Sequence, residues 1–447
     1  METFVPKKKL EDKRILLGPF ESLKEFNFGI FIIAMHFLLE FGSFQGLFPI
    51  LKTLKIPYIF SALSILYAAL LVFQGKVDFK SDVTRKFFIL CVFIIAYSLL
   101  YTEIEVFRIE TSKVFLLYLS HYIIIVSCIK KPSQFILLID VWIMSIVFSS
   151  FHGIMQGGLI WGNRWLNDEN HISLVVATAI PFALILFREF KLTTRKSLYV
   201  LALVFYVAVN VVAASRGGAL SMILVAFLSW LLLRHKVRIL IIMLLAVILV
   251  LNYAPKHFFE EMETLEEGTE EGTADDRIYL WGIAMDMFDD YPVLGVGPMN
   301  YPAQFSAYEQ GRRYPLGVAR VPHSTPVQWL AETGVIGSML LLLLFRALYK
   351  NWKLAAIIKN HPKYKDNEDR SSIFVNITHA CAIAQIGFWF GAFFLSLMEF
   401  PFYWCLVPFS EVWKNLTLKE IERLDKLEEE SPTIQKKSVS FINTLEE

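Results

Sequence analysis

Four short polar motifs interrupt an otherwise apolar chain, at residues 161–171, 215–218, 275–281 and 322–328. In three of them we single out one residue that could hold an anion or move a proton, namely Arg216, Arg277 and His323. Arginine binds phosphate through several N–H donors, and a histidine of near-neutral pKa can accept a proton from a hydroxyl group. Together they would suit a site that binds a phosphate-bearing lipid and activates an incoming hydroxyl.

Each of these residues also has a simpler structural explanation. Arg216 could extend to lipid headgroups, and His323 could make an ordinary structural hydrogen bond. Arg277 could pair with the two aspartates that precede it. Gly217 and Gly218, however, would let a bulky anion approach the backbone beside Arg216. Because all three residues are expected on one face of the protein, each beside a helix end or a glycine, we favour the joint site.

A helix start is predicted directly after His323. Thr325 as N-cap, Pro326 at the first helical position and Gln328 form the pattern of a capping box. The positive end of this helix would then face the site and favour an anion there. Glu332 lies two turns further on, where an ionisable group is a candidate for function, although helix packing through the glycines that follow explains it equally well.

A second helix is predicted from the aspartates at 275 and 276, which can cap it. Its apolar side would consist of Ile278, Trp281, Met285 and Phe288, which recur at helical spacing. We expect this helix to lie flat at the membrane surface, anchored by Trp281, with Arg277 held at headgroup height in its first turn.

The elements that must position these residues lie in a membrane. The chain has 447 residues, of which 55% are hydrophobic and only 19% charged, with a mean hydropathy of +0.50. A soluble globular protein needs a more charged surface, so an all-α, polytopic transmembrane bundle is expected. The cysteines lie in apolar runs and form no CxxC pair, which favours buried thiols over disulfides or a metal site. They are Cys91, Cys128, Cys381 and Cys405.

Runs of about 20 apolar residues predict transmembrane helices. We place twelve, near 28–50, 57–74, 87–101, 114–129, 135–160, 172–188, 198–213, 219–233, 237–253, 327–349, 379–397 and 400–416. The last two could be one span broken at Pro401. The expected organisation is an N-terminal segment (1–27), nine spans (28–253), a large loop (254–326) with amphipathic helices, three spans (327–416) and a tail (417–447).

Lys and Arg accumulate in alternate loops, which orients the spans because basic residues favour the cytoplasmic side. The loops after spans two, four, six, eight and ten are basic, as is the N-terminal segment. This predicts two cytoplasmic termini. The loop 254–326 then lies outside, opening with an acidic run that is typical of a solvated linker. The tail is expected to be an exposed helix from Leu418, followed by disorder after Pro432.

The motifs at 214–218, 276–285, 291–298 and 323–337, in this order, resemble the O-antigen ligase and polymerase superfamily. The similarity covers roughly residues 160–410. It implies a metal-independent, inverting glycosyltransferase with a helical membrane fold and no cofactor. Such enzymes take a glycan from undecaprenyl pyrophosphate at the periplasmic face of the bacterial inner membrane and join it to an acceptor hydroxyl.

The resemblance also implies roles for individual residues. Arg216 and Arg277 would hold the pyrophosphate, and His323 would activate the acceptor, so these three are the expected catalytic residues. Asn170 and His171 resemble the family's Asn-rich stretch before a span. The expected substrate-binding residues are Arg216, Arg277, Asn170, His171, Trp281 and Glu332. The sequence departs from the family at Ser324, where Asn is more common.

Our main hypothesis from the sequence is an O-antigen ligase that transfers a lipid-linked polysaccharide to lipid A-core. A polymerase that joins lipid-linked repeat units, and a ligase that glycosylates protein hydroxyls, share the same motifs. From a different class, a transporter of a lipid-linked anion is the alternative. Transporters tend to show inverted repeats and charges near the bilayer midplane, whereas here no repeat is found and the charges lie at the outer boundary. No nucleic-acid partner is expected.

Overall fold

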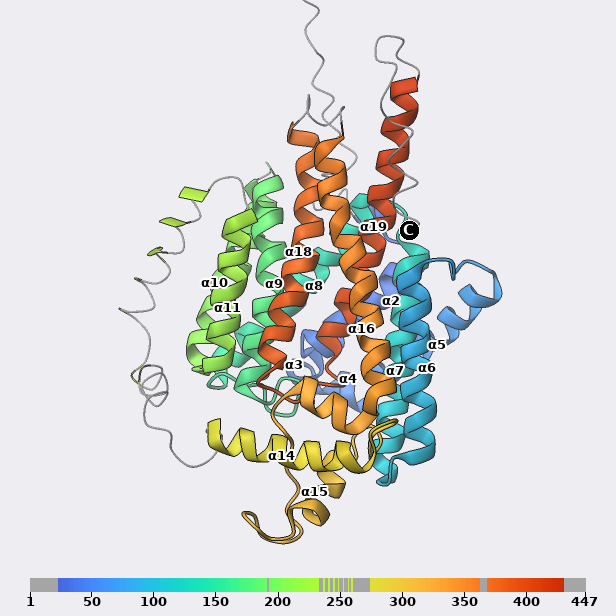
Figure 1. The fold of residues 1–447 in the computed structure, drawn as a ribbon. Helices are drawn as coiled ribbons and strands as arrows, with labels where there is room; N and C mark the ends of the chain where they lie inside the picture. The colour runs from blue at the N-terminus through green and yellow to red at the C-terminus, as the bar shows by residue number, and fades with distance from the viewer. Residues whose placement is uncertain are drawn as a thin grey trace, which may run out of the picture.

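The computed structural model describes residues 23–190, 193–232, 274–361 and 368–429, together with scattered residues between 236 and 259. Within these ranges the chain contains helices and no strands, which confirms the predicted all-α class (Figure 1). The first 22 residues, most of the segment expected as the ninth span, the acidic run up to residue 273, and the tail after Glu429 lie outside the described residues.

Eight of the described helices are long and apolar enough to cross a membrane, so the protein is a multi-pass membrane protein. They are α5 (Ile56–Phe73), α6 (Asp82–Tyr101), α7 (Glu105–Cys128), α8 (Pro132–Met155), α9 (Glu169–Glu189), α10 (Thr193–Ala213), α16 (Thr325–Asn360) and α18 (Glu368–Ala392). Two shorter apolar helical segments are Phe28–Phe41, formed by α2 (Phe28–His36) and η2 (Phe37–Phe41), and most of α11 (Arg216–Leu232).

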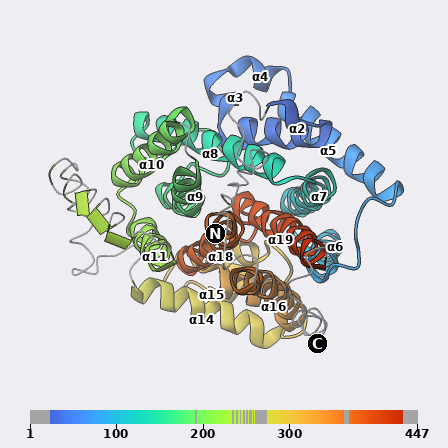
Figure 2. The ribbon, with the colours of Figure 1, turned by 90° about the horizontal axis from the view of Figure 1, so that it is seen from above.

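The helix α19 (Pro401–Glu429) lies inside the bundle, where α7, α8, α16 and α18 pack around it (Figure 2). It begins at Pro401, as the sequence predicted, because proline is favoured at the first helical position. It is not among the eight apolar spans because its mean hydropathy is too low, and it carries Glu411 and Lys414. The Glu411 carboxylate is fully buried and accepts hydrogen bonds from Ser81 (2.6 Å) and Asn351 (3.0 Å). A charged group is thus accommodated by partners within the bundle.

The long helix α16 is broken at Gly334, whose φ of 59° and ψ of −160° are non-helical. The loop before α15 (Tyr301–Glu309) docks into this break through backbone hydrogen bonds. They run from Val335 to Pro292, Ile336 to Val293, Val296 to Ala331 and Gly297 to Glu332, at 2.9–3.1 Å. The backbone groups released by the break are therefore satisfied by the loop, as a buried helix break requires.

The helix α14 (Ala274–Asp290) lies across one end of the bundle, roughly perpendicular to the spans (Figure 1). We call this the α14 end. Its direction across the spans agrees with the predicted flat helix, and the side that packs against the protein is a different one from the apolar side named in the sequence. Ile278 is 63% exposed, whereas Leu280, Ile283, Ala284 and Met287 are buried. They pack against Tyr301 and Phe305 of α15 and Ala331 of α16, and neither neighbour could be read from the periodicity of α14 alone.

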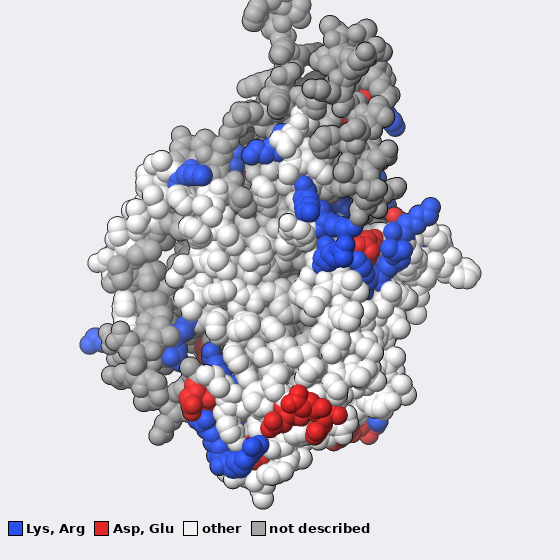
Figure 3. Space-filling view, in the orientation of Figure 1, with Lys and Arg blue, Asp and Glu red and all other residues white. Residues whose placement is uncertain are grey.

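Charged side chains lie toward the two ends of the bundle. On the face shown in Figure 3, Lys and Arg gather near the end opposite α14, and a broad uncharged zone follows. At the α14 end, acidic and basic side chains occur together. This distribution is typical of a protein whose middle lies in hydrocarbon.

Substituting Gly334 tests the docked break in α16. A Cβ at this position would lie 2.5 Å from the carbonyl carbon and oxygen of Val293, and the positive φ is unfavourable for any other residue. We expect Gly334→Ala to destabilise the purified protein by about 2 kcal/mol and to lower its Tm. Gly282→Ala is the control, because a Cβ there meets nothing within 4 Å. An unchanged Tm for Gly334→Ala would contradict this account.

Candidate active site

Three helices begin close together at the α14 end, and their N-termini surround the candidate site. Asp168 caps α9, and its Oδ1 accepts a hydrogen bond from the Asn170 backbone N–H (2.8 Å). Ser215 precedes α11: its hydroxyl donates to Asn170 Oδ1 (2.7 Å) and accepts from the Gly218 N–H (3.0 Å). The third start is that of α16, directly after His323. Helix N-termini carry partial positive charge, so their convergence favours an anion.

The two glycines after Arg216 do different things. A Cβ on Gly218 would lie 2.1 Å from Ser173 Cβ, so this glycine allows α11 to pack closely against α9. A Cβ on Gly217 would meet nothing within 4 Å. Space beside the Arg216 backbone, which the sequence predicted for both glycines, is therefore found at Gly217, while Gly218 serves helix packing.

Arg216 and Arg277 lie near each other at this convergence, and both are partly buried. Burial, and then the charge of Arg216, lower the pKa of Arg277. The Arg277 guanidinium lies 5.8 Å from the centre of the Phe394 ring, and its Nε is buried without a hydrogen-bond partner. Within the described ranges, neither arginine forms an ion pair with a carboxylate. Two cations held in this way create a site of fixed positive charge.

The aspartates beside Arg277 are engaged elsewhere. Asp276 is buried, accepts a hydrogen bond from the Tyr314 hydroxyl and lies 3.5 Å from Arg313 Nη2. Asp275 lies 3.1 Å from Arg313 Nη1. The salt bridge between Arg277 and its own aspartates, one of the sequence alternatives, is therefore not formed.

His323 occupies a constrained position between α14 and α16. Its φ of 47° is in the left-handed region, which is unusual for a residue other than glycine. The preceding carbonyl, that of Pro322, accepts a hydrogen bond from Trp281 Nε1 (2.9 Å). Trp281, expected as a membrane anchor, thus also fixes the segment that carries His323.

The surroundings of His323 favour the neutral form of its imidazole. Burial and then Arg277 lower the pKa of His323, and Arg320 acts in the same direction, while Asp168 and Asp276 oppose them. No residue in the described part of the chain forms a hydrogen bond with the ring. A neutral imidazole without a partner is free to accept a proton from a ligand.

The start of α16 differs from the predicted capping box. The helix begins at Thr325 with Ser324 as N-cap, and the Ser324 side chain makes no capping hydrogen bond. The Thr325 hydroxyl instead donates to the Leu395 carbonyl (2.6 Å) and accepts from the Leu397 N–H (2.9 Å). The predicted capping box is wrong because the Thr325 hydroxyl is hydrogen-bonded to the turn between α18 and α19, which is distant in the sequence.

Asn170 and His171 lie at the start of α9. Asn170 binds Ser215, as described above, and thereby joins α9 to α11. The His171 Nδ1 lies 3.1 Å from the Trp165 carbonyl oxygen, and its ring centre lies 5.3 Å from that of Phe400. Both residues are thus next to the site, with one polar atom each engaged by the protein.

Glu332 is not brought to the site. It is fully buried, and its carboxylate accepts hydrogen bonds from the backbone N–H groups of Met299 (2.9 Å) and Tyr301 (3.2 Å). These amides belong to the start of α15, so Glu332 holds that helix against α16. The sequence showed its helical position but not the loop that folds onto it.

Two charged residues near His323 were given no role from the sequence. Asp168 could have been recognised as an N-cap, since aspartate before an apolar helix is a common start signal. Arg320 lies 4.8 Å over the Tyr314 ring, a contact that depends on how the loop after α15 folds. Among the described residues, no group of three or more His, Cys, Asp or Glu is placed to hold a metal ion.

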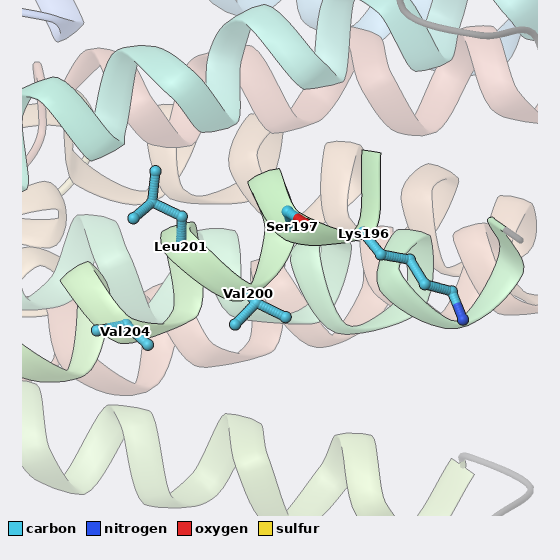
Figure 4. Close-up of a pocket in the computed structure, with 5 residues that line it drawn as sticks. All are labelled: Lys196, Ser197, Val200, Leu201 and Val204. Carbon is cyan, nitrogen blue, oxygen red and sulfur yellow. The ribbon is translucent and has the colours of Figure 1, made fainter. Parts of the chain in front are cut away.

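A separate hollow of about 350 Å³ lies on α10 (Figure 4). It is lined by Lys196, Ser197, Val200, Leu201 and Val204. Apart from Lys196 and Ser197 its lining is aliphatic. None of the candidate site residues lines it, so it is not the site described here.

Residues 200–342 match the model of a known protein family, described as O-antigen ligase. Over these residues the chain is similar to the O-antigen ligase family. The matched segment contains Arg216, Arg277 and His323, and the resemblance seen in the sequence is confirmed over this range. No curated protein matches the chain.

The arginine pair can be tested with inorganic pyrophosphate as a ligand. Because bound pyrophosphate would relieve the repulsion between Arg216 and Arg277, we expect it to raise the Tm of the purified protein, by a stabilisation of about 2.7 kcal/mol at 100 times its Kd. Arg277→Ala should lose most of this shift. Arg85→Ala is the control, because Arg85 is exposed and pairs with Asp82 in α6. Equal shifts in both variants would contradict an anion site at Arg277.

Proposed function

We propose that this protein is an O-antigen ligase, which transfers a glycan from undecaprenyl pyrophosphate to a hydroxyl of lipid A-core. One observation carries the proposal: two arginines that pair with no carboxylate of the described residues lie near His323, whose pKa is lowered by burial, where three helix N-termini meet. The fixed positive charge suits a pyrophosphate, and the histidine suits an acceptor hydroxyl. The family match over the same residues supports this assignment.

The proposed reaction is a single displacement. The acceptor oxygen attacks the anomeric carbon of the donor glycan while its proton passes to His323. The bond between that carbon and the pyrophosphate oxygen breaks, and undecaprenyl pyrophosphate leaves with the electron pair. Arg216 and Arg277 neutralise the charge that develops on the leaving group. One displacement from the opposite side inverts the configuration at the anomeric carbon.

The leaving group explains why this set of residues is sufficient. Pyrophosphate is already a good leaving group, so stabilising its charge matters more than protonating it. Two guanidinium groups and three helix N-termini supply the positive charge that stabilises the leaving pyrophosphate. We therefore propose a metal-independent reaction without a cofactor. Asn170 and His171, beside Arg216, are proposed to contact the donor or the acceptor. Trp281 is proposed to contact the substrate as well as to hold the His323 segment.

The proposed setting is the bacterial inner membrane, with the α14 end in the periplasm. The basic residues at the opposite end support this orientation, because Lys and Arg favour cytoplasmic loops (Figure 3). The proposed topology has about twelve spans, two cytoplasmic termini and a large periplasmic loop over 254–326 that includes α14 and α15. Both lipid-linked substrates would then reach the site from the outer leaflet.

The site residues predict a clear activity pattern. We expect Arg216→Ala, Arg277→Ala and His323→Ala each to lower glycan transfer by purified protein about 10²-fold or more, since each removes a preorganised group. His152→Ala is the control for loss of a histidine from another helix. Retained transfer in any of the three site variants, with normal insertion and melting, would contradict the role of that residue.

The pH dependence follows from the direction of the His323 pKa. A general base must be neutral, and the pKa of His323 lies below its usual value of 6.5. We therefore expect transfer at pH 6.5 to exceed half of its maximum and to fall to half only at a more acidic pH. A rate that already falls by half at or above pH 6.5 would contradict a base of lowered pKa.

The acceptor is tested by the envelope glycolipids of a strain that lacks this gene. Long glycan chains on the lipid carrier with bare lipid A-core would support a ligase. A core that bears a single repeat unit would instead indicate the polymerase reaction of the same superfamily. Normal lipid A-core glycans with unmodified envelope proteins would indicate a ligase for protein hydroxyls.

A further inference from the structure

Ser215 occupies the N-cap position of α11, and its side chain binds two different helices. The Ser215 carbonyl accepts the Ala219 N–H (2.9 Å), and the hydroxyl oxygen accepts the Gly218 N–H (3.0 Å), as an N-cap serine does. The hydroxyl proton is donated to Asn170 Oδ1 (2.7 Å) on α9. One side chain therefore fixes both the start of α11, where Arg216 lies, and the amide of Asn170.

The direction of this chain of hydrogen bonds follows from the groups that form it. A backbone N–H such as that of Gly218 can only donate, so the Ser215 hydroxyl accepts from it and gives its own proton to another acceptor. Ser215 is 3% exposed, so a hydroxyl proton without an acceptor would be costly. Among the described residues that acceptor is Asn170 Oδ1. The amide oxygen of Asn170 is thus committed to Ser215, and its NH2 group is left as the other end of the side chain.

The Asn170 NH2 group is available to a ligand. Asn170 is partly exposed, and no residue in the described part of the chain accepts a hydrogen bond from its Nδ2. The Asn170 backbone N–H is already held by Asp168 Oδ1 (2.8 Å). An amide NH2 group carries two hydrogen-bond donors and no acceptor. It therefore complements phosphate oxygens, and it cannot accept the hydrogen of a hydroxyl.

The connection between α10 and α11 holds Ser215 in place. Ala214 has a φ of 48°, in the left-handed region that residues other than glycine rarely adopt. On one side of this turn, a Cβ on Gly158 would lie 2.4 Å from Ala213 Cα. On the other side, a Cβ on Gly218 would lie 3.0 Å from Ser215 Oγ. Close packing on both sides thus keeps the hydroxyl of Ser215 in one position, as preorganisation of a binding group requires.

We propose that Ser215 is a positioning residue that orients the Asn170 amide, so that its NH2 group donates to a phosphate oxygen of the pyrophosphate beside Arg216. This inference rests on the proposed function, and it assigns Asn170 to the lipid-linked donor substrate. Arg216 would supply positive charge, and Asn170 would supply a neutral hydrogen-bond donor of fixed direction. Hydrogen bonds to a charged oxygen are about twice as strong as those between neutral groups, so the contribution should be visible in pyrophosphate affinity.

The test is the Kd of inorganic pyrophosphate for the purified full-length protein, measured by calorimetry at an ionic strength of about 0.15 M. Asn170→Asp keeps an acceptor for Ser215 but replaces the NH2 group by an anionic oxygen. We expect it to weaken binding about tenfold or more. Asn167→Asp is the matched control, because it adds the same charge at an exposed residue three positions earlier. Salt screens such a charge, so its Kd should change less than about threefold.

The role of Ser215 is tested with the same measurement. Ser215→Ala removes the hydroxyl that orients the amide, and we expect it to weaken binding about fivefold. In an Asn170→Ala background the same substitution should weaken binding no further, because Ser215 acts through the amide. Ser221→Ala is the control. It removes another buried hydroxyl of α11, which has no hydrogen-bond partner, and it should leave the Kd unchanged.

Several outcomes would overturn the inference. Wild-type affinity in Asn170→Asp or in Ser215→Ala would do so, as would equal losses in Asn167→Asp and Asn170→Asp, because charge alone would explain them. Additive losses in the double variant would show that Ser215 does not act through Asn170. If Ser215→Ala does not fold, Ser215→Gly, which caps a helix better than alanine, takes its place with the same expected loss. A wild-type protein that binds no pyrophosphate would instead refute the proposed function, whatever the variants do.

Discussion

The repulsion between two guanidinium groups is the constraint on which the α14 end of this protein depends. Arg216 and Arg277 come from different helices, and each would be more stable beside a carboxylate or in water. The aspartates nearest to Arg277 are held by Arg313 and Tyr314 instead. The charge of Asp276 still favours the charged form of Arg277, but no carboxylate among the described residues pairs with either arginine, which leaves both available for an anionic substrate.

A scaffold must resist this repulsion, and here several short connections do so together. The Ser215 hydroxyl joins α11 to α9 through Asn170, Trp281 joins α14 to the segment before α16, and Thr325 joins α16 to the turn before α19. Each is a hydrogen bond between elements that are far apart in the sequence. The loop docked into the break at Gly334 then holds α14 and α15 against the spans.

One electrostatic arrangement serves two purposes in the proposed reaction. The cations that would stabilise the departing pyrophosphate also help to lower the pKa of His323, which keeps the imidazole neutral and able to accept a proton. The same field disfavours the imidazolium once it forms.

The sequence alone determined the membrane class, the helical fold and the motifs with Arg216, Arg277 and His323, because hydropathy and helix-start signals are local properties of the chain. It also predicted the break before Pro401 and the flat helix over residues 275–288. Only the tertiary structure decided which face of α14 is buried, that Thr325 binds the turn at 395–397, and that Glu332 supports α15. These depend on contacts between segments tens to hundreds of residues apart, which no local pattern encodes.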